Sequence, residues 1–328
     1  MGNKNIISGI SKFLDDKDTE FVSLDLGTKY IKCLEIKDKK ICNVFVEDSR
    51  KPTVKSAIEL LKKRGLTSKK IKLTLKGPDT IIRYVNFPKL DKAKLKESFG
   101  FELSKHIPFP QQDVYYDIFV LDENYSQKEF LVLLAVAKKE LIDSLLEEFT
   151  KEKISIADIS LNAISLINLY YHTHHPDSNV AILDMGFSST ILSLLKKDKP
   201  YLSREIRIAG KALIKKIAAA SGMANEEIDR NLLNPTQQKE LLAVGEEVIT
   251  DLCDEVKNSF DYLEMNTGEQ IQTIYLTGGL AAINGVKDTI DAILGIETKI
   301  WQPWNKLNTG KESYFPKEML SAVAGLNL

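Results

Sequence analysis

The amino-acid sequence predicts an α/β protein built from two similar domains, and a repeated hairpin carries this prediction. Residues 21–36 read FVSLDLGTKYIKCLEI, an apolar strand, a tight turn around Asp-x-Gly and a second apolar strand. The same pattern returns at residues 180–195 as VAILDMGFSSTILSLL. A repeat at this spacing, roughly 160 residues, suggests two domains that each present one such hairpin.

Length and composition agree with this architecture and exclude several classes of protein. A chain of 328 residues is ample for two domains with substantial cores. The formal net charge is -1, so we expect no nucleic-acid partner. No apolar run is long enough to span a bilayer, and no secretory signal is visible. Cys33, Cys42 and Cys253 fit buried thiols of a reduced cytoplasmic protein, with a Cys33–Cys42 bridge as the alternative.

The turn of each hairpin has residue types that suit a bound phosphate. Gly27 lets the backbone come close, Thr28 and the loop N–H groups donate hydrogen bonds, and Asp25 can hold Mg²⁺ through water. An ordinary hairpin turn without a ligand is the alternative for one copy alone. The second turn offers the equivalent residues Asp184, Gly186, Ser188 and Ser189.

A third element fits the same kind of site. Residues 274–286 read IYLTGGLAAINGV, a short strand that runs into Gly278 and Gly279 and then a helix. Paired glycines at a strand end allow close approach of a flat ring or a ribose, and the following helix N-terminus favours negative charge.

The segments around the first hairpin complete a β-rich half of the first domain. Strands are predicted at residues 39–46, 71–75 and 81–87, with an amphipathic helix at 53–64 that Gly65 ends. Before them, residues 1–20 form a leader in which Ile6, Ile7, Ile10, Phe13 and Leu14 fall at helical spacing. We expect this leader to be frayed or packed locally, with contact to a membrane or a partner as the alternative.

Pro88 opens a distinct module between the two hairpins. Asp91 is the expected N-cap of a helix within residues 90–110, and Leu95, Phe99 and Leu103 share its apolar face. Strands at 114–121 and 129–137, a helix at 139–152 and a helix at 157–171 follow.

Two Asp-Gly hairpins and a late strand–Gly–Gly–helix resemble the actin-like (ribonuclease H-like) ATPase superfamily. That resemblance makes the Asp25 loop the first phosphate motif and the Asp184 loop the second. It makes Lys32 a phosphate-contacting lysine, and Gly278, Gly279 and Leu280 the adenosine motif. The placement of the module between the hairpins resembles the inserted subdomain of the FtsA-type branch.

Several segments are similar to one family of that branch, the PilM proteins of type IV pilus assembly. The most diagnostic is E-x-x-x-x-I-P-F-P at residues 102–110, followed by Tyr115 and Tyr116 and by VLLAVAKKE. REIRIAGKAL at residues 204–213 and the closing SAVAGLNL add to it. The resemblance extends over about residues 21–328.

Membership of this family implies an ATP- and Mg²⁺-binding cytoplasmic protein, peripheral at the inner membrane. The implied partner is the cytoplasmic N-terminal peptide of a bitopic PilN-like protein, and through it a PilO-like protein. Contact with the pilus motor ATPases and oligomerisation are left open. The implied division is a leader (1–20), a first core domain (21–88, 156–178 and 304–328), an inserted subdomain (89–155), a second core domain (179–212 and 269–303) and a helical cap (213–268).

The first hairpin departs from the family pattern, because Thr28 is followed by Lys29 and Tyr30 in place of small hydroxyl residues. Lys29 either contacts a phosphate or points to solvent, and Tyr30 either crowds the loop or packs on the sheet. The helix at 157–171 offers only Asp158 and Asn162 as polar groups to orient a water. We therefore expect slow hydrolysis, or ATP as a structural ligand, and assign no catalytic residue.

Contacts to adenine come from the cap helices in this superfamily. The candidates here are Gly210, Lys211 and Lys215 at the start of the cap and Glu255, Lys257 and Ser259 further on; a solvated helix face is the alternative. The metal candidates are Asp25 and Asp184. The cluster of His172, His174 and His175 lacks the spacing of a metal site and is interpreted as a solvated loop.

The sequence therefore predicts an assembly scaffold in which ATP and Mg²⁺ hold two core domains closed. Closure would shape a docking site for an extended peptide, with residues 107–116 as the candidate region. An FtsA-like filament is the main alternative, although the chain ends at Leu328 without the linker and membrane-targeting helix usual there. A small-molecule kinase would need a further catalytic Asp, and a GspL-type protein a transmembrane helix.

Overall fold

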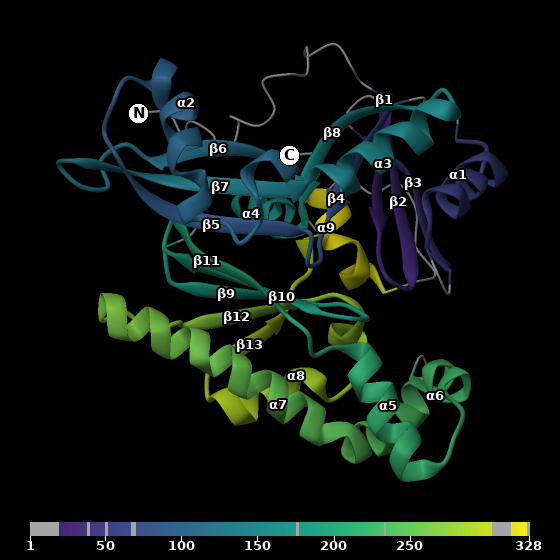
Figure 1. The fold of residues 1–328 in the computed structure, drawn as a ribbon. Coiled ribbons are helices and arrows are strands. Elements are labelled where there is room, and N and C mark those ends of the chain that lie inside the picture. Colours follow the sequence, from purple (N-terminus) through teal and green to yellow (C-terminus); the bar gives the residue numbers. More distant parts are fainter. Residues whose placement is uncertain are drawn as a thin grey trace.

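The structure is a computed structural model that describes residues 20–37, 40–49, 52–66, 70–174, 177–232, 234–303 and 316–326. The predicted leader helix, His175 and the last two residues lie outside this part of the chain. The described strands form two five-stranded sheets and one three-stranded sheet. In Figure 1 the first five-stranded sheet and the three-stranded sheet lie side by side in the upper half, with the second five-stranded sheet below them.

The two five-stranded sheets share one topology. Each begins with three antiparallel strands that neighbour one another in chain order, and each continues with two parallel strands on the other side of the first strand. The first has the order β3-β2-β1-β4-β8 and the second the order β11-β10-β9-β12-β13. The strands are β1 (Glu20–Leu26), β2 (Tyr30–Lys37), β3 (Lys40–Asp48), β4 (Lys70–Leu75) and β8 (Ser155–Leu161), then β9 (Val180–Met185), β10 (Thr190–Lys196), β11 (Lys199–Ile206), β12 (Thr273–Thr277) and β13 (Glu297–Ile300).

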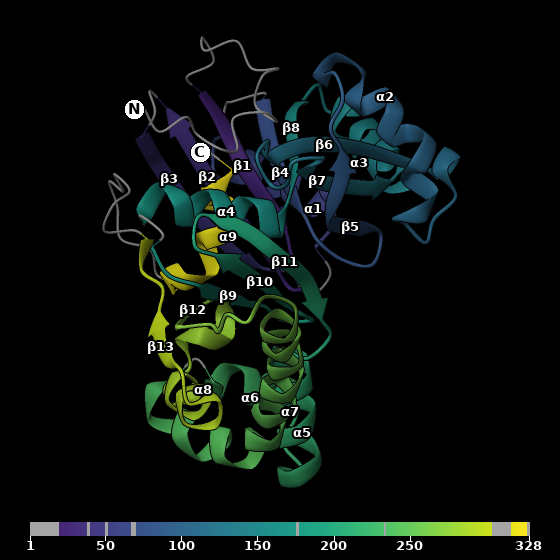
Figure 2. The ribbon, with the colours of Figure 1, turned by 90° about the vertical axis from the view of Figure 1, so that its left-hand side faces the viewer.

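A shared core joins the two sheets. Helix α4 (Asn162–Thr173) and the short helix α9 (Ser321–Gly325) pack between them, and both are buried on nearly all sides. Figure 2 shows the two helices between the upper and the lower sheet. Because one apolar cluster contains residues of both sheets, the two halves of the chain are in direct contact along this layer.

The three-stranded sheet contains β5 (Thr80–Pro88), β7 (Glu129–Lys138) and β6 (Val114–Asp122) in that order. Helix α2 (Lys92–Glu102) covers it, with Asp91 accepting a hydrogen bond from the Ala93 N–H as the predicted N-cap. Leu95, Phe99 and Leu103 are buried against the sheet, as predicted. The helix and two strands after Pro88 therefore form as the sequence indicates.

One prediction about this region is wrong. We expected the strand at residues 81–87 to belong to the β-rich half of the first domain, but β5 pairs with β7 along its whole length, from Thr80↔Ala137 to Pro88↔Glu129. The chain leaves the first sheet at the turn after β4, where Gly77 has φ of +118°, a conformation that favours glycine. Pairing with a strand fifty residues later, roughly, is not encoded locally.

A second prediction is also wrong. The helix expected at residues 157–171 starts only at Asn162, because Ser155–Leu161 forms β8, parallel to β4 with Ile71 opposite Ile156. Asp158 consequently lies on a strand beside Lys72 and not on the helix between the halves. Tertiary pairing has overridden the helical pattern here.

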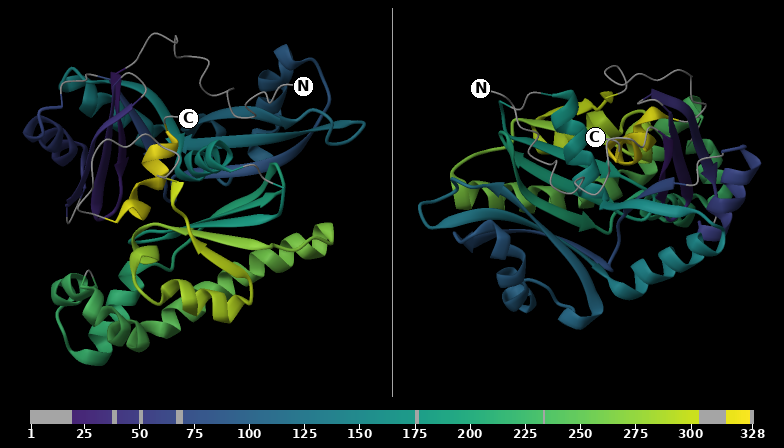
Figure 3. Two further views of the ribbon diagram at one scale, coloured as in Figure 1. Left: turned by 180° about the vertical axis from the view of Figure 1, so that it is seen from behind. Right: turned by 90° about the horizontal axis from the view of Figure 1, so that it is seen from above.

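The remaining helices cover the outer faces. Helix α1 (Val54–Lys63) has a capping box between Thr53 and Ser56, and α3 (Lys139–Lys151) packs beside it on the first sheet. Helices α5 (Gly210–Ser221), α6 (Asn225–Leu232), α7 (Pro235–Thr267) and α8 (Val286–Leu294) cover the second sheet. Figure 3 shows α7 running along the length of the lower half. Short 3₁₀ turns lie at Leu103–Lys105, Gln111–Asp113, Gly279–Ala282 and Lys317–Leu320.

No helix in the described part of the chain is both long enough and apolar enough to cross a membrane.

Candidate functional site

The two predicted hairpin turns lie against each other. In each turn the glycine N–H donates to the carbonyl three residues on, Gly27 to Tyr30 at 3.0 Å and Gly186 to Ser189 at 3.1 Å. The Thr28 hydroxyl donates to the Ser188 hydroxyl across the gap at 2.9 Å. The duplicated sheets thus bring two turns of the same shape together at the boundary between the halves.

A buried lysine lies between the two strand-end carboxylates. Lys32 Nζ donates to Asp25 Oδ2 at 2.8 Å, and both side chains are almost fully buried. Burial tends to raise the pKa of Asp25, but the charges of Lys32 and Lys76 outweigh it and hold the pKa below its usual value. Burial tends to lower the pKa of Lys32, yet Asp25 and then Asp184 raise it. Asp25 and Lys32 are therefore a charged pair.

Asp184 differs from Asp25 in having a carboxylate oxygen that no described residue engages in a hydrogen bond. Its Oδ2 is buried and has no hydrogen-bond partner among the described residues, and the same holds for Ser189 Oγ in the adjacent turn. Unpartnered buried polar atoms cost free energy, about 1–3 kcal/mol each, so they are uncommon where no ligand or water completes them. The second turn has the character of a binding site.

The diglycine bend reaches the same place. Gly278 has φ of +88°, and a Cβ there would stand 2.6 Å from Asp184 Oδ1 and 2.5 Å from the Met185 carbonyl oxygen. Only glycine fits this position, since any side chain would collide with backbone. The third predicted element therefore packs directly on the second hairpin.

A cavity of about 270 Å³ opens beside these elements. Among the predicted residues, its lining includes Tyr30, Lys32, Gly186, Gly210, Gly279 and Leu280. Its other walls are mostly apolar, from Phe187, Ile214, Leu232, Pro235, Ala282, Ile283, Pro316 and Met319, with polar groups from Asp229, Gln238 and Asn284. An apolar recess with a few polar groups is typical of small-molecule sites.

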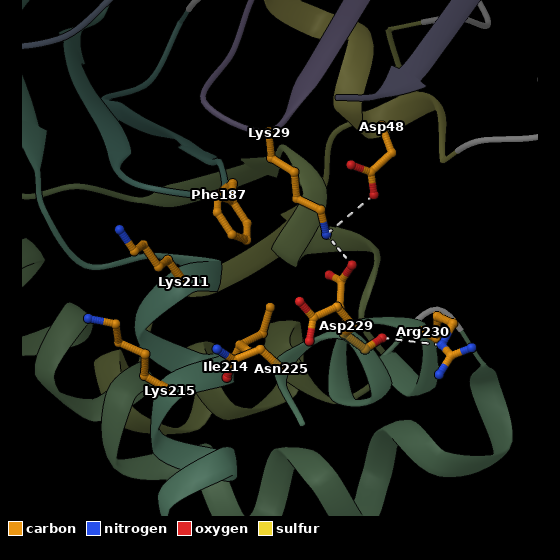
Figure 4. Close-up of a pocket in the computed structure, with 10 residues that line it drawn as sticks. Lys29, Asp48, Phe187, Lys211, Ile214, Lys215, Asn225, Asp229 and Arg230 are labelled. Atoms are coloured by element: carbon orange, nitrogen blue, oxygen red, sulfur yellow. Dashed lines mark hydrogen bonds and ion pairs between the residues drawn. The ribbon is translucent and has the colours of Figure 1, made fainter. Parts of the chain in front are cut away.

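Lys29 crosses the second turn, with its Nζ 5.1 Å from the centre of the Phe187 ring, and ends at the cap. Its Nζ forms an ion pair with Asp229 of α6 and lies 3.7 Å from Asp48, and Figure 4 shows it passing Phe187 to reach them. Burial tends to lower the pKa of Lys29, but the hydrogen bonds and charges around it, first the hydrogen bond that its ammonium group donates to Asp229, more than compensate, so the pKa is raised. Lys29 therefore joins the first hairpin to the cap.

The start of the cap rests on the second hairpin. The Gly210 N–H donates to the Gly186 carbonyl at 3.2 Å, and the Lys211 N–H to the Phe187 carbonyl at 2.7 Å. Lys211 and Lys215 line a second, more open cavity of about 670 Å³ together with Lys29 and Arg230 (Figure 4). These three predicted residues are thus close to the hairpins.

The other candidates predicted from the cap lie away from the hairpins. Glu255 pairs with Arg204 of β11 at 2.7 Å, Ser259 is buried and donates to the Glu255 carbonyl at 3.4 Å, and Lys257 is exposed. Helix α7 reaches the 270 Å³ cavity only with Pro235 and Gln238. At about 1.5 Å per residue, Glu255 is roughly 26 Å further along the helix. The prediction that Glu255, Lys257 and Ser259 contact the ligand is therefore corrected: they lie outside the cleft.

Other residues at the site were not found from the sequence. Gln238 is buried, donates to the Leu232 carbonyl at 2.8 Å and accepts from the Asn284 N–H at 3.0 Å, which fixes two polar groups in the cavity. Asn284 lies within the predicted segment 274–286, but the sequence pattern assigned it no role. Nothing local marks Gln238, Asp229 or Lys76, because tertiary packing brings them to the site.

A family model described as type IV pilus assembly protein PilM matches residues 24–324. This chain belongs to the PilM family. The family resemblance predicted from the insertion motif is therefore confirmed, and the protein is a member of a family of pilus assembly proteins.

Solved structures show the fold of this PilM-family chain. It is similar to a PilM-PilN type IV pilus biogenesis complex, with a TM-score of 0.83, 19% identity, and coverage of 94% of this chain and 97% of that one. A Bacteroides thetaiotaomicron protein with an actin-like ATPase fold matches with a TM-score of 0.51 and 10% identity over 94% and 98% of the two chains. MreB5 of Spiroplasma citri, bound to AMPPNP, matches at 0.52 and 12% over 94% and 95%. The predicted actin-like fold is confirmed.

Proposed function

We propose that this PilM-family chain binds ATP with Mg²⁺ between its two hairpin turns and acts as a scaffold of type IV pilus assembly. The observation that carries the proposal is the pair of unpartnered buried atoms, Asp184 Oδ2 and Ser189 Oγ, at the point where both turns meet. The phosphates would lie on the Gly27 and Gly186 turns, and the nucleoside in the 270 Å³ cavity. One structural neighbour, MreB5, holds AMPPNP, which agrees with this assignment.

The donor set fits Mg²⁺ bound mainly through phosphate and water. No group of three or more His, Cys, Asp or Glu side chains is gathered for a metal in the described part of the chain. Mg²⁺ in nucleotide sites commonly uses one or two carboxylates. Asp184 has a free oxygen, whereas Asp25 is engaged by Lys32, so Asp184 is the better ligand of the two metal candidates. When bound, Mg²⁺ and ATP together supply a charged bridge between the two turns.

The polar groups near the turns favour binding over rapid hydrolysis. Asn162 at the start of α4 accepts a hydrogen bond from Thr74 Oγ1 at 2.6 Å, and an amide has no basic proton acceptor. Asp158 lies on β8 next to Lys72, where burial raises its pKa against the opposing charge of that lysine. We therefore propose that ATP serves chiefly to hold the halves together, with slow turnover or none.

The proposed partner is the cytoplasmic N-terminal peptide of a PilN-like protein, which would hold the chain at the inner membrane and link it to a PilO-like protein. The similar solved structure is a PilM-PilN complex. Strand β6 is an edge of its sheet, since it pairs only with β7 among the described strands, and an open edge can accept an extended peptide.

Within the predicted docking region, Ile107 and Val114 belong to the core of the inserted subdomain. Tyr115 is 46% exposed and donates its hydroxyl to Asp143 Oδ1 at 3.0 Å. Peptide contacts from this region are therefore proposed for the surface at Tyr115 on β6, and not for the segment as a whole.

Two measurements test the proposal. Titration calorimetry with Mg²⁺ and AMPPNP should give saturable one-to-one binding, and Asp184→Ala should abolish it while the circular dichroism spectrum stays that of a folded protein. A synthetic N-terminal peptide of the PilN-like protein should bind more tightly when AMPPNP is present. If the peptide binds but no nucleotide does, the proposed scaffold role stands and the proposed ATP binding is wrong.

A further inference from the structure

Lys76 is a cation at the site that has no hydrogen-bond or ion-pair partner among the described residues. It follows β4, and its Nζ lies 3.0 Å from the position that a Cβ on Gly186 would occupy, so the ammonium group touches the second turn. Its charge also acts on Asp25 at the end of β1. No hydrogen bond or ion pair joins the Lys76 side chain to any other residue in the described part of the chain, unlike Lys29 and Lys32.

A small cavity of about 60 Å³ lies at this lysine. Ile191 of β10, which stands opposite Asp184, forms part of its wall, and its polar lining comes from Lys76, Thr80, Asn162, Ser203, Arg204 and Glu205. Asn162 is 1% exposed, and its Nδ2 has no hydrogen-bond partner among the described residues. The cavity thus contains an unpaired ammonium group and an unpaired amide donor beside the turn that bears Ser189.

The Gly186 turn lines one cavity and contacts Lys76. The cavity is the mostly apolar one of about 270 Å³ where we place the nucleoside. Lys76, which the turn touches, in turn lines the cavity of about 60 Å³. A chain of phosphates that starts at the nucleoside and crosses this turn would bring its last phosphoryl group to Lys76.

We propose that Lys76 binds the terminal phosphoryl group and makes the site select a nucleoside triphosphate over a diphosphate. This inference rests on the proposed ATP site and adds to it the residue that distinguishes the two nucleotides. Lys32 does not serve this purpose, since its charge is balanced by Asp25 and Asp184. An ammonium group without a partner binds a phosphoryl group without first breaking an ion pair.

The position of Lys76 in the chain links this contact to the inserted subdomain. Lys76 directly precedes the turn that leads into β5, where the Thr80 hydroxyl donates to the Gly77 carbonyl at 2.9 Å. Asp79 in the same turn pairs with Lys138 at the end of β7, at 2.6 Å. The terminal phosphoryl group would thereby be connected through Lys76 and the turn after it to β5 and β7, two strands of the sheet whose open edge is β6.

Calorimetry with AMPPNP and with ADP, each with Mg²⁺, tests the proposal on three forms of the full chain. We expect Lys76→Met to weaken the binding of AMPPNP at least about 10-fold, the size of one lost charge-assisted hydrogen bond. The affinity for ADP should change by less than about 3-fold. Lys76→Arg should keep most of the preference for AMPPNP. The matched control is Lys63→Met on α1, whose side chain is 70% exposed and lines neither the 270 Å³ nor the 60 Å³ cavity.

The outcomes separate the two proposals. Equal losses for both nucleotides, or no loss for either, would overturn the role of Lys76 and leave ATP binding in place. A wild-type chain that binds neither nucleotide would overturn both. If Lys76→Met fails to fold by circular dichroism, Lys76→Gln, which keeps a polar end of smaller size, carries the same expectation.

Discussion

The first and second hairpins have the same backbone but different chemistry. Both close with a glycine N–H bonded to the carbonyl three residues on. In the first, Asp25 is paired with Lys32, and Lys29 is paired with Asp229 and Asp48. In the second, Asp184 Oδ2 and Ser189 Oγ have no hydrogen-bond partner within the part of the chain that the structure describes. The first hairpin satisfies its own charges and holds the halves together, and the second keeps polar groups available for a ligand.

If this contrast is correct, removing the charge of Lys32 should have the largest effect on stability. Lys32→Met leaves Asp25 buried without its partner, and breaking a buried pair in this way costs about 3–5 kcal/mol. Urea denaturation followed by circular dichroism measures the loss. Lys151→Met is the control, because Lys151 pairs with Glu147 on the surface of α3, where the two side chains are 67% and 68% exposed, and its loss should be far smaller. Equal losses for the two variants would contradict the assignment.

The second hairpin should respond in the opposite way. Asp184→Asn removes a charge that acts on Lys32 but forms no direct ion pair with a described residue, so the free energy of unfolding should change by only about 1 kcal/mol. Binding of Mg²⁺·AMPPNP should fall by about 100-fold, since the metal ligand is lost. Calorimetry and urea denaturation on one preparation compare the two quantities. A large loss of stability with unchanged affinity would mean that Asp184 is structural.

A smaller effect is expected where the first hairpin meets the cap. Asp229→Asn weakens the ion pair with Lys29, the connection from this loop to α6. We expect a loss of about 1 kcal/mol in stability and a several-fold faster release of bound nucleotide, because the cap is held less firmly. Release is measured by displacement of a fluorescent ATP analogue. Glu226→Gln on the same helix is the control and should leave the release rate unchanged.

The smallest expected effect is the pH dependence of stability, which tests whether Asp25 and Lys32 of the first hairpin are a charged pair. The folded pKa of Asp25 is lowered, so its contribution is present above the unfolded value, about 3.9, and is lost as pH falls through the folded pKa. The folded pKa of Lys32 is raised, so its contribution is present below about 10.4 and is lost as pH rises through the folded value. The difference in unfolding free energy between wild type and Asp25→Asn should therefore be constant from about pH 5 to 9 and shrink in acid. A difference that grows below pH 4 would contradict the pairing.

The sequence was a good guide wherever an element depends on its own neighbours. Both turns, the α2 cap at Asp91 and the apolar face of Leu95, Phe99 and Leu103 follow from local patterns, and all of them are present. The sequence also predicted the diglycine bend. The structure shows why a glycine stands at 278: a side chain there would collide with the backbone of Met185. The family followed from a short motif in the inserted subdomain, and the family model agrees.

Only the tertiary structure decided how distant segments combine. It paired β5 with β7, turned residues 155–161 into a strand beside β4, and placed Glu255 far along α7 from the cleft. It paired Lys29 with Asp229, and it placed Lys76 beside Gly186 without an ion pair to any described residue. Turns and caps are fixed by hydrogen bonds within a few residues, which a sequence displays directly. The partner of a strand or of a long charged side chain depends on contacts between segments far apart in the chain. The local sequence pattern does not specify which distant segment will supply that partner.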